Sequence, residues 1–354
     1  SFMKKNRNIL IVLIVLLVVA FGIWLTNSTN TFQTSRSDFK LDDSASVSKI
    51  FMSDKNNNSL TLKKVDNAQW MVNDKYPAQK FNIDLLLKTM VDIEVSFPVA
   101  KAAHNSIIKE LAANSVKVEI YQVKPWLDIF GLRLWPGERL SKVYYVGGAT
   151  PDNQGSFMLM EGSSEPFVVY LPGFRGFVSP RYSPFEKYWR DYNVFRVQIP
   201  DIISVRVESP AIPEFSFEVT NRGDNTFKLI GLKENKEVKY DTLKLLNFLS
   251  GFRNLNFEAL INDMDPPKKD SILSSAPFLV VTVKDKSGVT KTMRAFHKKG
   301  PDGQTDMEGR PLPYDLDRLY ALVNDGRDFT LIQYYNFDKI LRPLPYFLPE
   351  ADHR

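Results

Sequence analysis

The sequence predicts an α+β protein in which a single N-terminal transmembrane helix precedes a duplicated body. Three observations lead to this fold class. Residues 9–25 contain no charged or strongly polar side chain. In the body, each half combines short strand patterns with one main amphipathic helix, which predicts a twisted, mostly antiparallel sheet with a helix covering one face. The same order of elements returns after about 155–158 residues, as expected of a duplicated unit.

Residues 9–25 are expected to form a signal anchor in the inner (cytoplasmic) membrane. At about 1.5 Å per residue the helix spans roughly 26 Å, near the lower limit for a bilayer. Lys4, Lys5 and Arg7 precede it, so the positive-inside rule places residues 1–8 in the cytoplasm and the body in the periplasm. A cleaved signal peptide is the alternative. We favour the anchor because no small-residue cleavage site follows the run.

The composition predicts a large and nearly neutral body. Of the 46 basic residues, three precede the apolar run, and the other 43 are balanced by 41 acidic residues, which argues against a nucleic-acid partner. The lack of cysteine excludes disulfides, thiol catalysis and cysteine metal sites. We interpret Ser1 and Phe2 as a cloning remnant and residues 26–37 as a polar tether.

The first α+β repeat is expected at residues 38–195. Asn82 is a residue type preferred at a helix N-cap, so we expect the main helix to begin there. The predicted elements are strands at 46–52, 59–65 and 69–72, a helix at 82–91, an extended segment at 93–95, a helix at 106–113, and strands at 116–123, 142–147, 156–160 and 167–171.

The second α+β repeat is expected at residues 196–354, and it closes with a proline-rich C-terminal tail. Asp241 corresponds to Asn82 as the N-cap of the main helix. The predicted elements are strands at 203–207, 215–219 and 227–229, a helix at 241–249, an extended segment at 257–259, strands at 277–283 and 290–297, and a helix at 316–323.

Residues 125–137 are predicted to be an apolar loop between two strands of the first repeat. Its apolar candidates are Trp126, Phe130, Leu132 and Trp135, whereas loops normally present polar side chains. One interpretation is an exposed surface for a partner or for the membrane interface. The other, which we favour slightly, is a segment folded back into the core or into the seam between the halves.

The junction between the two repeats is rich in proline, glycine, arginine and aromatic residues. Arginine and aromatic side chains dominate the hot spots of protein interfaces, and they also form cation–π pairs in ordinary interdomain packing. We favour packing and keep partner binding as the alternative. The candidates are Phe174, Arg175, Phe177, Arg181 and Trp189.

Motifs of catalysis are not apparent in the sequence. Its three histidines have no metal-ligand spacing, and it has no nucleophile elbow, phosphate loop or dinucleotide fingerprint. Asp302, Asp306 and Glu308 fit a solvated hairpin loop better than a calcium loop. We therefore expect no catalytic residue, no metal and no cofactor.

Several segments resemble a known family. They are the third strand with Trp70, and the segments at 170–177 (YLPGFRGF), 188–195 (YWRDYNVF), 320–326 (YALVNDG) and 333–343 (QYYNFDKILRP). The chain resembles the bacterial domain-of-unknown-function proteins of the 4340 type, in the form found in Bacteroidetes. The resemblance covers nearly the whole body and implies a periplasmic protein anchored in the inner membrane. Some relatives sit beside ABC transporter components of the gliding type, which implies a role in envelope assembly or transport. In such proteins Asp43-Ser44-Ala45 also fits a loose O-glycosylation pattern, with Ser44 as the acceptor.

The expected function follows from location rather than from chemistry. We expect a non-enzymatic accessory subunit of a cell-envelope complex for secretion, transport, motility or outer-membrane biogenesis, with other envelope proteins as partners. The alternative is a periplasmic binding module for a lipid or another apolar ligand held between the two halves. A hydrolase whose site leaves no mark in the sequence is a third, weaker possibility.

Overall fold

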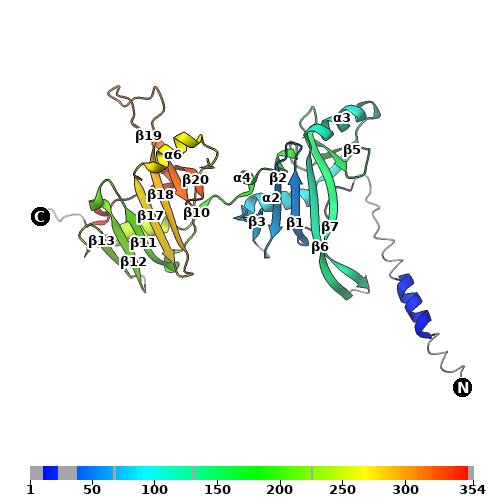
Figure 1. The fold of residues 1–354 in the computed structure, drawn as a ribbon, viewed down its shortest axis with the longest axis horizontal. Coiled ribbons are helices and arrows are strands. Elements are labelled where there is room, and N and C mark those ends of the chain that lie inside the picture. Colours follow the sequence, from blue (N-terminus) through cyan, green and yellow to red (C-terminus); the bar gives the residue numbers. More distant parts are fainter. Residues whose placement is uncertain (1–10, 23–37, 67–68, 130–131, 225, 350–354) are drawn as a thin grey trace, which may run out of the picture. The chain divides into compact units, whose positions relative to one another are not determined.

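Two compact units divide the protein, Ser1–Arg190 and Asp191–Arg354 (Figure 1). The boundary between the units, after Arg190, lies a few residues before position 195, the predicted end of the first repeat. The computed structural model describes residues 11–22, 38–66, 69–129, 132–224 and 226–349, and the side chains of all of these except 126–135.

Residues 11–22 are helical, and nearly all of their side chains are exposed. Within the described ranges, no helix is both long and apolar enough to cross a membrane. Residues 9, 10 and 23–25 of the expected anchor lie outside these ranges, as does the tether at 26–37.

The first unit is built on a nine-stranded antiparallel sheet with the spatial order β4-β3-β2-β1-β6-β7-β8-β9-β5. Its strands are β1 (Val47–Ser53), β2 (Ser59–Lys64), β3 (Trp70–Val72), β4 (Tyr76–Pro77), β5 (Glu94–Pro98), β6 (Val116–Ile129), β7 (Leu132–Ala149), β8 (Ser156–Met160) and β9 (Phe167–Tyr170). Helix α2 (Lys80–Asp92) leads from β4 to β5, and α3 (Lys101–Asn114) leads from β5 to β6. The short η1 (Ser179–Arg181) and α4 (Glu186–Trp189) end the unit.

The second unit contains a nine-stranded sheet in the order β14-β13-β12-β11-β17-β18-β19-β20-β16. Its strands are β11 (Ile202–Glu208), β12 (Phe217–Gly223), β13 (Thr226–Gly231), β14 (Lys236–Glu237), β16 (Ala259–Leu260), β17 (Leu279–Asp285), β18 (Thr290–Lys299), β19 (Tyr314–Val323) and β20 (Asp328–Gln333). A separate pair joins β10 (Asn193–Phe195) to β15 (Leu255–Asn256). The helical segments are α5 (Thr242–Ser250), α6 (Pro266–Ser274), α7 (Tyr334–Phe337), η2 (Ile199–Asp201), η3 (Pro213–Phe215) and η4 (Leu344–Phe347).

The predicted class is confirmed at the level of an α+β protein with two large antiparallel sheets. The two sheets have the same strand order, and β1 and β11 each carry an irregularity directly after their first residue, Val47 and Ile202. When the two sheets are aligned at these irregularities and compared strand by strand, Val146 of the first unit corresponds to Ala295 of the second. Their partners on the next strand, Met158 and Ala321, also correspond. On the last strands, Gly155, Val168 and Tyr170 then correspond to Arg318, Leu331 and Gln333.

The two main helices begin differently. Asp241 is the N-cap of α5 as predicted, because its carboxylate accepts the N–H groups of Leu243 and Lys244. Asn82 is not the N-cap of α2, which already begins at Lys80 after Gln79. Its amide instead donates to the carbonyl oxygen of Tyr188 at 2.7 Å, so a tertiary contact uses the group that we expected to cap the helix.

The helix predicted at 316–323 is wrong, since this segment is part of strand β19. Leu319, Ala321 and Val323 face the main core, while Tyr320 and Leu322 pack on the opposite face. A strand buried on both faces reads as a continuous apolar run, and over eight residues such a run also fits helical spacing.

The apolar loop predicted at 125–137 is also corrected. Strands β6 and β7 continue through this segment as one long hairpin, in which Pro125 lies opposite Pro136 and Ile129 opposite Leu132. The hairpin extends beyond β1, whose last pair with β6 joins Val47 to Gln122 (Figure 1).

Each unit is closed by an aromatic residue near its end. The carbonyl oxygen of Trp189 accepts the N–H of Gln79 before α2, at 2.7 Å, and that of Phe347 accepts the N–H of Asp241 before α5, at 2.8 Å. Both aromatic side chains are fully buried. In each unit, an aromatic residue near the C-terminal end of that unit therefore contacts the residue that precedes the main helix.

The second face of each sheet is covered differently. In the first unit, Leu111 of α3 occupies the space where a side chain at Gly147 would lie, only 2.4 Å from the position of such a Cβ atom. In the second unit, Phe296, Tyr320 and Phe329 form a small buried cluster, with partly buried residues of α6 packed against it.

Candidate functional site

An apolar groove of about 590 Å³ lies on the sheet of the first unit. Met158 and Val169 belong to the core, so strand alternation turns Phe157 and Val168 to the opposite face, where they line the groove. Three segments form it: Ser96 and Phe97; Thr150, Pro151, Asp152, Gln154, Gly155 and Phe157; and Val168, Tyr170, Leu171, Gly173, Phe174 and Arg175.

One wall of the groove comes from β5, which is an edge strand of the sheet. The pairing of β5 with β9 is irregular between Val95 and Phe97, and the strand ends at Pro98. Phe97 is 57% exposed although it borders the groove. An exposed phenylalanine beside an open apolar groove is available for contact with an apolar ligand.

The loop after β7 forms the second wall and is fixed by its own hydrogen bonds. The hydroxyl of Thr150 donates to Asp152 Oδ1 at 2.6 Å and accepts the N–H of Gly155 at 3.0 Å. The N–H of Gln154 donates to the same Asp152 oxygen at 3.1 Å. The bond from Thr150 and the bond from Gln154 hold the pKa of Asp152 below its usual value, so the carboxylate is charged and already bonded.

Gly155 lines the groove and is packed closely against β9. A Cβ atom there would lie 2.9 Å from Val168 Cγ1 and 3.0 Å from the carbonyl oxygen of Val169. Both distances are shorter than ordinary van der Waals contacts, so a larger residue would disturb the sheet. The groove therefore depends on glycine at this position.

Phe174 and Arg175 lie on the third segment, after β9. The guanidinium of Arg181 lies 4.6 Å from the centre of the Phe174 ring, and its Nη1 donates to Thr89 Oγ1 of α2 at 2.7 Å. These contacts hold Phe174 at the groove. Arg175 is exposed, and among the described residues no carboxylate lies within ion-pair distance of it. Its positive charge is thus available at the margin of an apolar surface.

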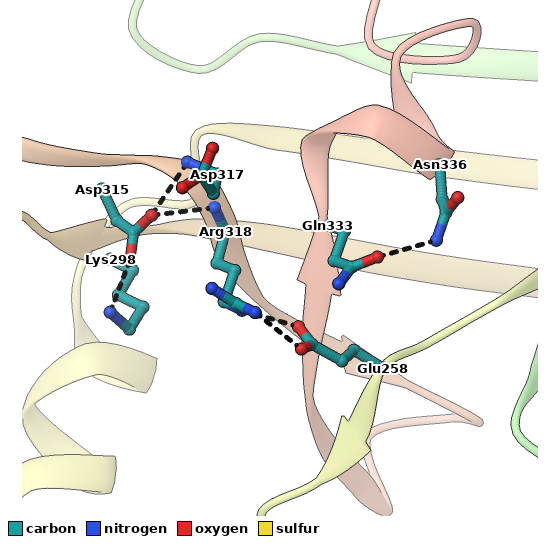
Figure 2. Close-up of polar contacts among 7 residues, drawn as sticks. All are labelled: Glu258, Lys298, Asp315, Asp317, Arg318, Gln333 and Asn336. Atoms are coloured by element: carbon teal, nitrogen blue, oxygen red, sulfur yellow. Dashed lines mark hydrogen bonds and ion pairs between the residues drawn. The ribbon is translucent and has the colours of Figure 1, made fainter.

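The corresponding place in the second unit is occupied by charged side chains (Figure 2). Arg318, which corresponds to Gly155, donates to both carboxylate oxygens of Glu258 at 2.8 and 2.9 Å. Lys298 Nζ lies 2.6 Å from Asp315 Oδ2. The hydrogen bond from Arg318 lowers the pKa of Glu258 despite partial burial. Gln333 stands where the first unit has Tyr170 and accepts from Asn336 at 3.0 Å.

The structure separates the residues singled out in the junction. Phe174 and Arg175 line the groove, Arg181 packs behind Phe174, and Phe177 is half-buried. Trp189 is fully buried, and its indole N–H donates to the carbonyl oxygen of Ser183 at 2.7 Å, which corrects its assignment as a partner-binding candidate. A buried ring held by an internal hydrogen bond offers no surface to a partner.

The other candidate residues lie away from the groove or outside the described side chains. Ser44 is half-buried in the turn before β1, where Asp43 accepts the N–H of Ala45 at 2.8 Å. The side chains of Trp126, Phe130, Leu132 and Trp135 are outside the described residues. In the described part of the chain, no group of three histidine or acidic side chains is placed to hold a metal ion.

Of the residues that line the groove, the sequence singled out only Phe174 and Arg175 as candidates; among those missed are Phe97, Gly155, Phe157 and Val168. They lie in short strands and turns that are ordinary in sequence, and only the sheet order brings them together. The one sequence feature that could have indicated the groove is Gly155 at the end of the turn at 150–155, because glycine beside a strand often marks a position that tolerates no side chain.

Comparison with known proteins yields one match. The family described as "Domain of unknown function (DUF4340)" matches residues 70–273. This range begins in β3 and ends in α6, so it includes the groove. Neither a curated protein nor a solved structure matches the chain.

Proposed function

This chain belongs to the DUF4340 family, and on that premise we propose that it is a non-enzymatic, membrane-anchored binding subunit of a cell-envelope complex. The complex would act in secretion, transport, motility or outer-membrane biogenesis. The apolar run at 9–25 supports an anchor in the inner membrane, and the basic residues before it support a periplasmic body. An envelope of the Bacteroidetes type is part of this proposal.

The observation that carries the proposal is the difference between the two units. The shared strand order and the matching closures by Trp189 and Phe347 support an origin by duplication. In the first unit, Gly155 leaves an apolar groove open, whereas Arg318 and Glu258 fill the corresponding place in the second. Divergence of this kind favours a division of labour, with the first unit binding and the second acting as a rigid partner module.

In-cell photo-crosslinking tests the proposal directly. A photoreactive phenylalanine analogue at position 97 places the probe in the groove, and one at position 81 is the matched control. Phe81 is 70% exposed in the same unit and does not line the groove. We expect position 97 to yield discrete adducts that position 81 does not. Identical adduct patterns at the two positions, or none at either, would contradict a binding role for the groove.

The hairpin arm at 123–140 supports a second contact with the envelope. Val123 and Leu140 are more than 40% exposed, and the arm carries two tryptophans near its tip. We propose that it contacts a partner or the membrane interface, where tryptophan is favoured. The double variant Trp126→Ala and Trp135→Ala should lower recovery of partners in mild detergent, while unchanged recovery, fitness and localisation would refute this role.

A second candidate function is the binding of a lipid or another apolar ligand. The specific observation in its favour is the apolar lining of the groove in the first unit, with a volume inside the range of about 300–1,000 Å³ found for small-molecule sites. The photo-crosslinking experiment separates the two functions, because it shows whether the adduct at position 97 is a protein or a lipid.

A further inference from the structure

We propose that the groove of the first unit binds an anionic amphiphile, with the acyl chain against the apolar walls and a carboxylate or phosphate at Arg175. This inference rests on the proposed binding function and specifies the ligand of the same site. Three features carry it: the walls, the edge strand and the charge.

The walls suit a flexible hydrocarbon chain. Phe97, Phe157, Val168 and Phe174 contribute apolar surface from segments that the sheet holds in place. The hydroxyl of Tyr170 donates to Glu94 at 3.0 Å, so its hydrogen-bonding group is already used. Transfer of an acyl chain from water to such walls is favourable in proportion to the apolar area buried.

The edge strand makes an extended peptide a poor alternative. A peptide that adds to a sheet needs a regular row of free backbone groups. The pairing of β5 is irregular around Ser96, and Pro98 lacks an N–H group. Bulges and prolines are the devices by which proteins prevent pairing at sheet edges. A lipid needs no backbone pairing, so these devices do not hinder it.

The charge selects an anion. Arg175 lines the groove, and no described carboxylate is within ion-pair distance of its guanidinium. Asp152 also lines the groove and keeps its negative charge, but hydrogen bonds from Thr150 and Gln154 hold its Oδ1 within its own loop, so the anion is placed at Arg175. The guanidinium thus remains to bind a carboxylate or a phosphate, both of which match its planar donors.

Photoreactive lipids test the inference on the full-length protein in nanodiscs of phosphatidylcholine. Three probes carry a diazirine in the acyl chain and differ in the head: a fatty acid, a phosphatidic acid and a neutral fatty alcohol. Labelled peptides are mapped by mass spectrometry. We expect at least one anionic probe to label residues 96–97, 150–157 or 168–175 about tenfold more than the neutral probe does, as charge-assisted hydrogen bonding predicts. The two anionic arms distinguish carboxylate from phosphate.

Matched variants identify the groups involved. Arg175→Gln should reduce anionic labelling to the level of the neutral probe, and Arg253→Gln, at another exposed arginine, should not. Phe97→Ala should reduce labelling by all three probes, while Phe81→Ala should not. Because both aromatic side chains are mostly exposed, these variants keep the core intact.

Equal labelling by neutral and anionic probes, or labelling of Arg175→Gln at the native level, would overturn the inference. A protein segment captured at position 97 in cells, without lipid labelling in nanodiscs, would also overturn it and leave the binding function standing. Absence of both kinds of adduct would refute the binding function as well.

Discussion

Replacing Trp189 by alanine should unfold the first unit at much lower denaturant while leaving the second unit unchanged. Trp189 is fully buried, and its indole N–H donates to Ser183 at 2.7 Å. Burial of about 200 Å² of aromatic surface at about 25 cal/mol per Å² corresponds to about 5 kcal/mol. Tryptophan-to-alanine changes in cores typically cost about 3–5 kcal/mol, and the unpaired carbonyl oxygen of Ser183 adds about 1 kcal/mol.

The expected loss is therefore about 4–6 kcal/mol of the free energy of unfolding of the first unit. With a denaturant slope of about 2 kcal/mol per molar urea, the midpoint should fall by about 2–3 M. The assay is urea unfolding of residues 38–354, followed by tryptophan fluorescence. All five tryptophans precede Asp191, so fluorescence reports only the first unit, and Trp70, which is 6% exposed, retains the signal in the variant.

Phe347→Ala is the matched control in the second unit, where the buried ring lies 5.0 Å from that of Phe217. It should lower the second transition, seen by far-UV circular dichroism, and leave the fluorescence midpoint in place. A fluorescence midpoint that falls by less than about 0.5 M in Trp189→Ala would refute the role of this residue in closing its unit. So would a Phe347→Ala variant that shifts the fluorescence transition as strongly.

Three further predictions concern packing and titration. Gly147→Val should force Leu111 and α3 away from the sheet, cost about 1–3 kcal/mol and speed hydrogen exchange in α3, whereas unchanged exchange would contradict this close packing. Burial lowers the pKa of His297, whose ring stacks on Tyr314, so stability is complete above about pH 6.5 and falls as the pH drops below it. His297→Phe keeps a ring there, and the urea midpoint of the second unit should then change less between pH 7.5 and 5.5. Burial would raise the pKa of Asp315, but the hydrogen bond from Lys298 and two backbone N–H groups outweigh it and lower the pKa. Its contribution is therefore present above about pH 4 and lost as the pH falls further, and Asp315→Asn should flatten acid unfolding monitored by circular dichroism.

Local patterns predicted most of the elements because short alternating strands and capped helices carry their signal in adjacent residues. Asp241 illustrates this, since its side chain caps the helix that follows it directly. Asn82 shows the limit: its amide contacts Tyr188, more than one hundred positions away, and no local pattern reveals such a partner. Likewise, Leu316 to Val323 fits a helix by spacing, and only burial on both faces of a sheet makes it a strand.

The groove could not be predicted from the sequence, because it depends on the order of strands in the sheet. Phe174 and Arg175 were candidates because of their residue types, but they form a groove only together with residues such as Phe97 and Gly155. Those residues meet only because β5 pairs with β9 at the edge of the sheet. The apolar composition at 125–137 was correctly recognised as unusual, yet it belongs to a continuous hairpin, because strand pairing there extends past the end of β1.

The placement of β5 determines when the first unit can fold during synthesis. Among the described strands, β5 pairs with β9 alone. Glu94 therefore pairs only after Tyr170 has been made, and the residue before α2 gains its hydrogen bond only after Trp189 has been made. Such long-range pairings form late, because the intervening chain must be ordered first. Once residue 190 has emerged, however, every strand of this sheet is present, and the first unit can complete its fold while the second is still being made. A chain that stalls before β9 would leave β5 without its partner strand, and unpaired strand edges of this kind are prone to aggregation.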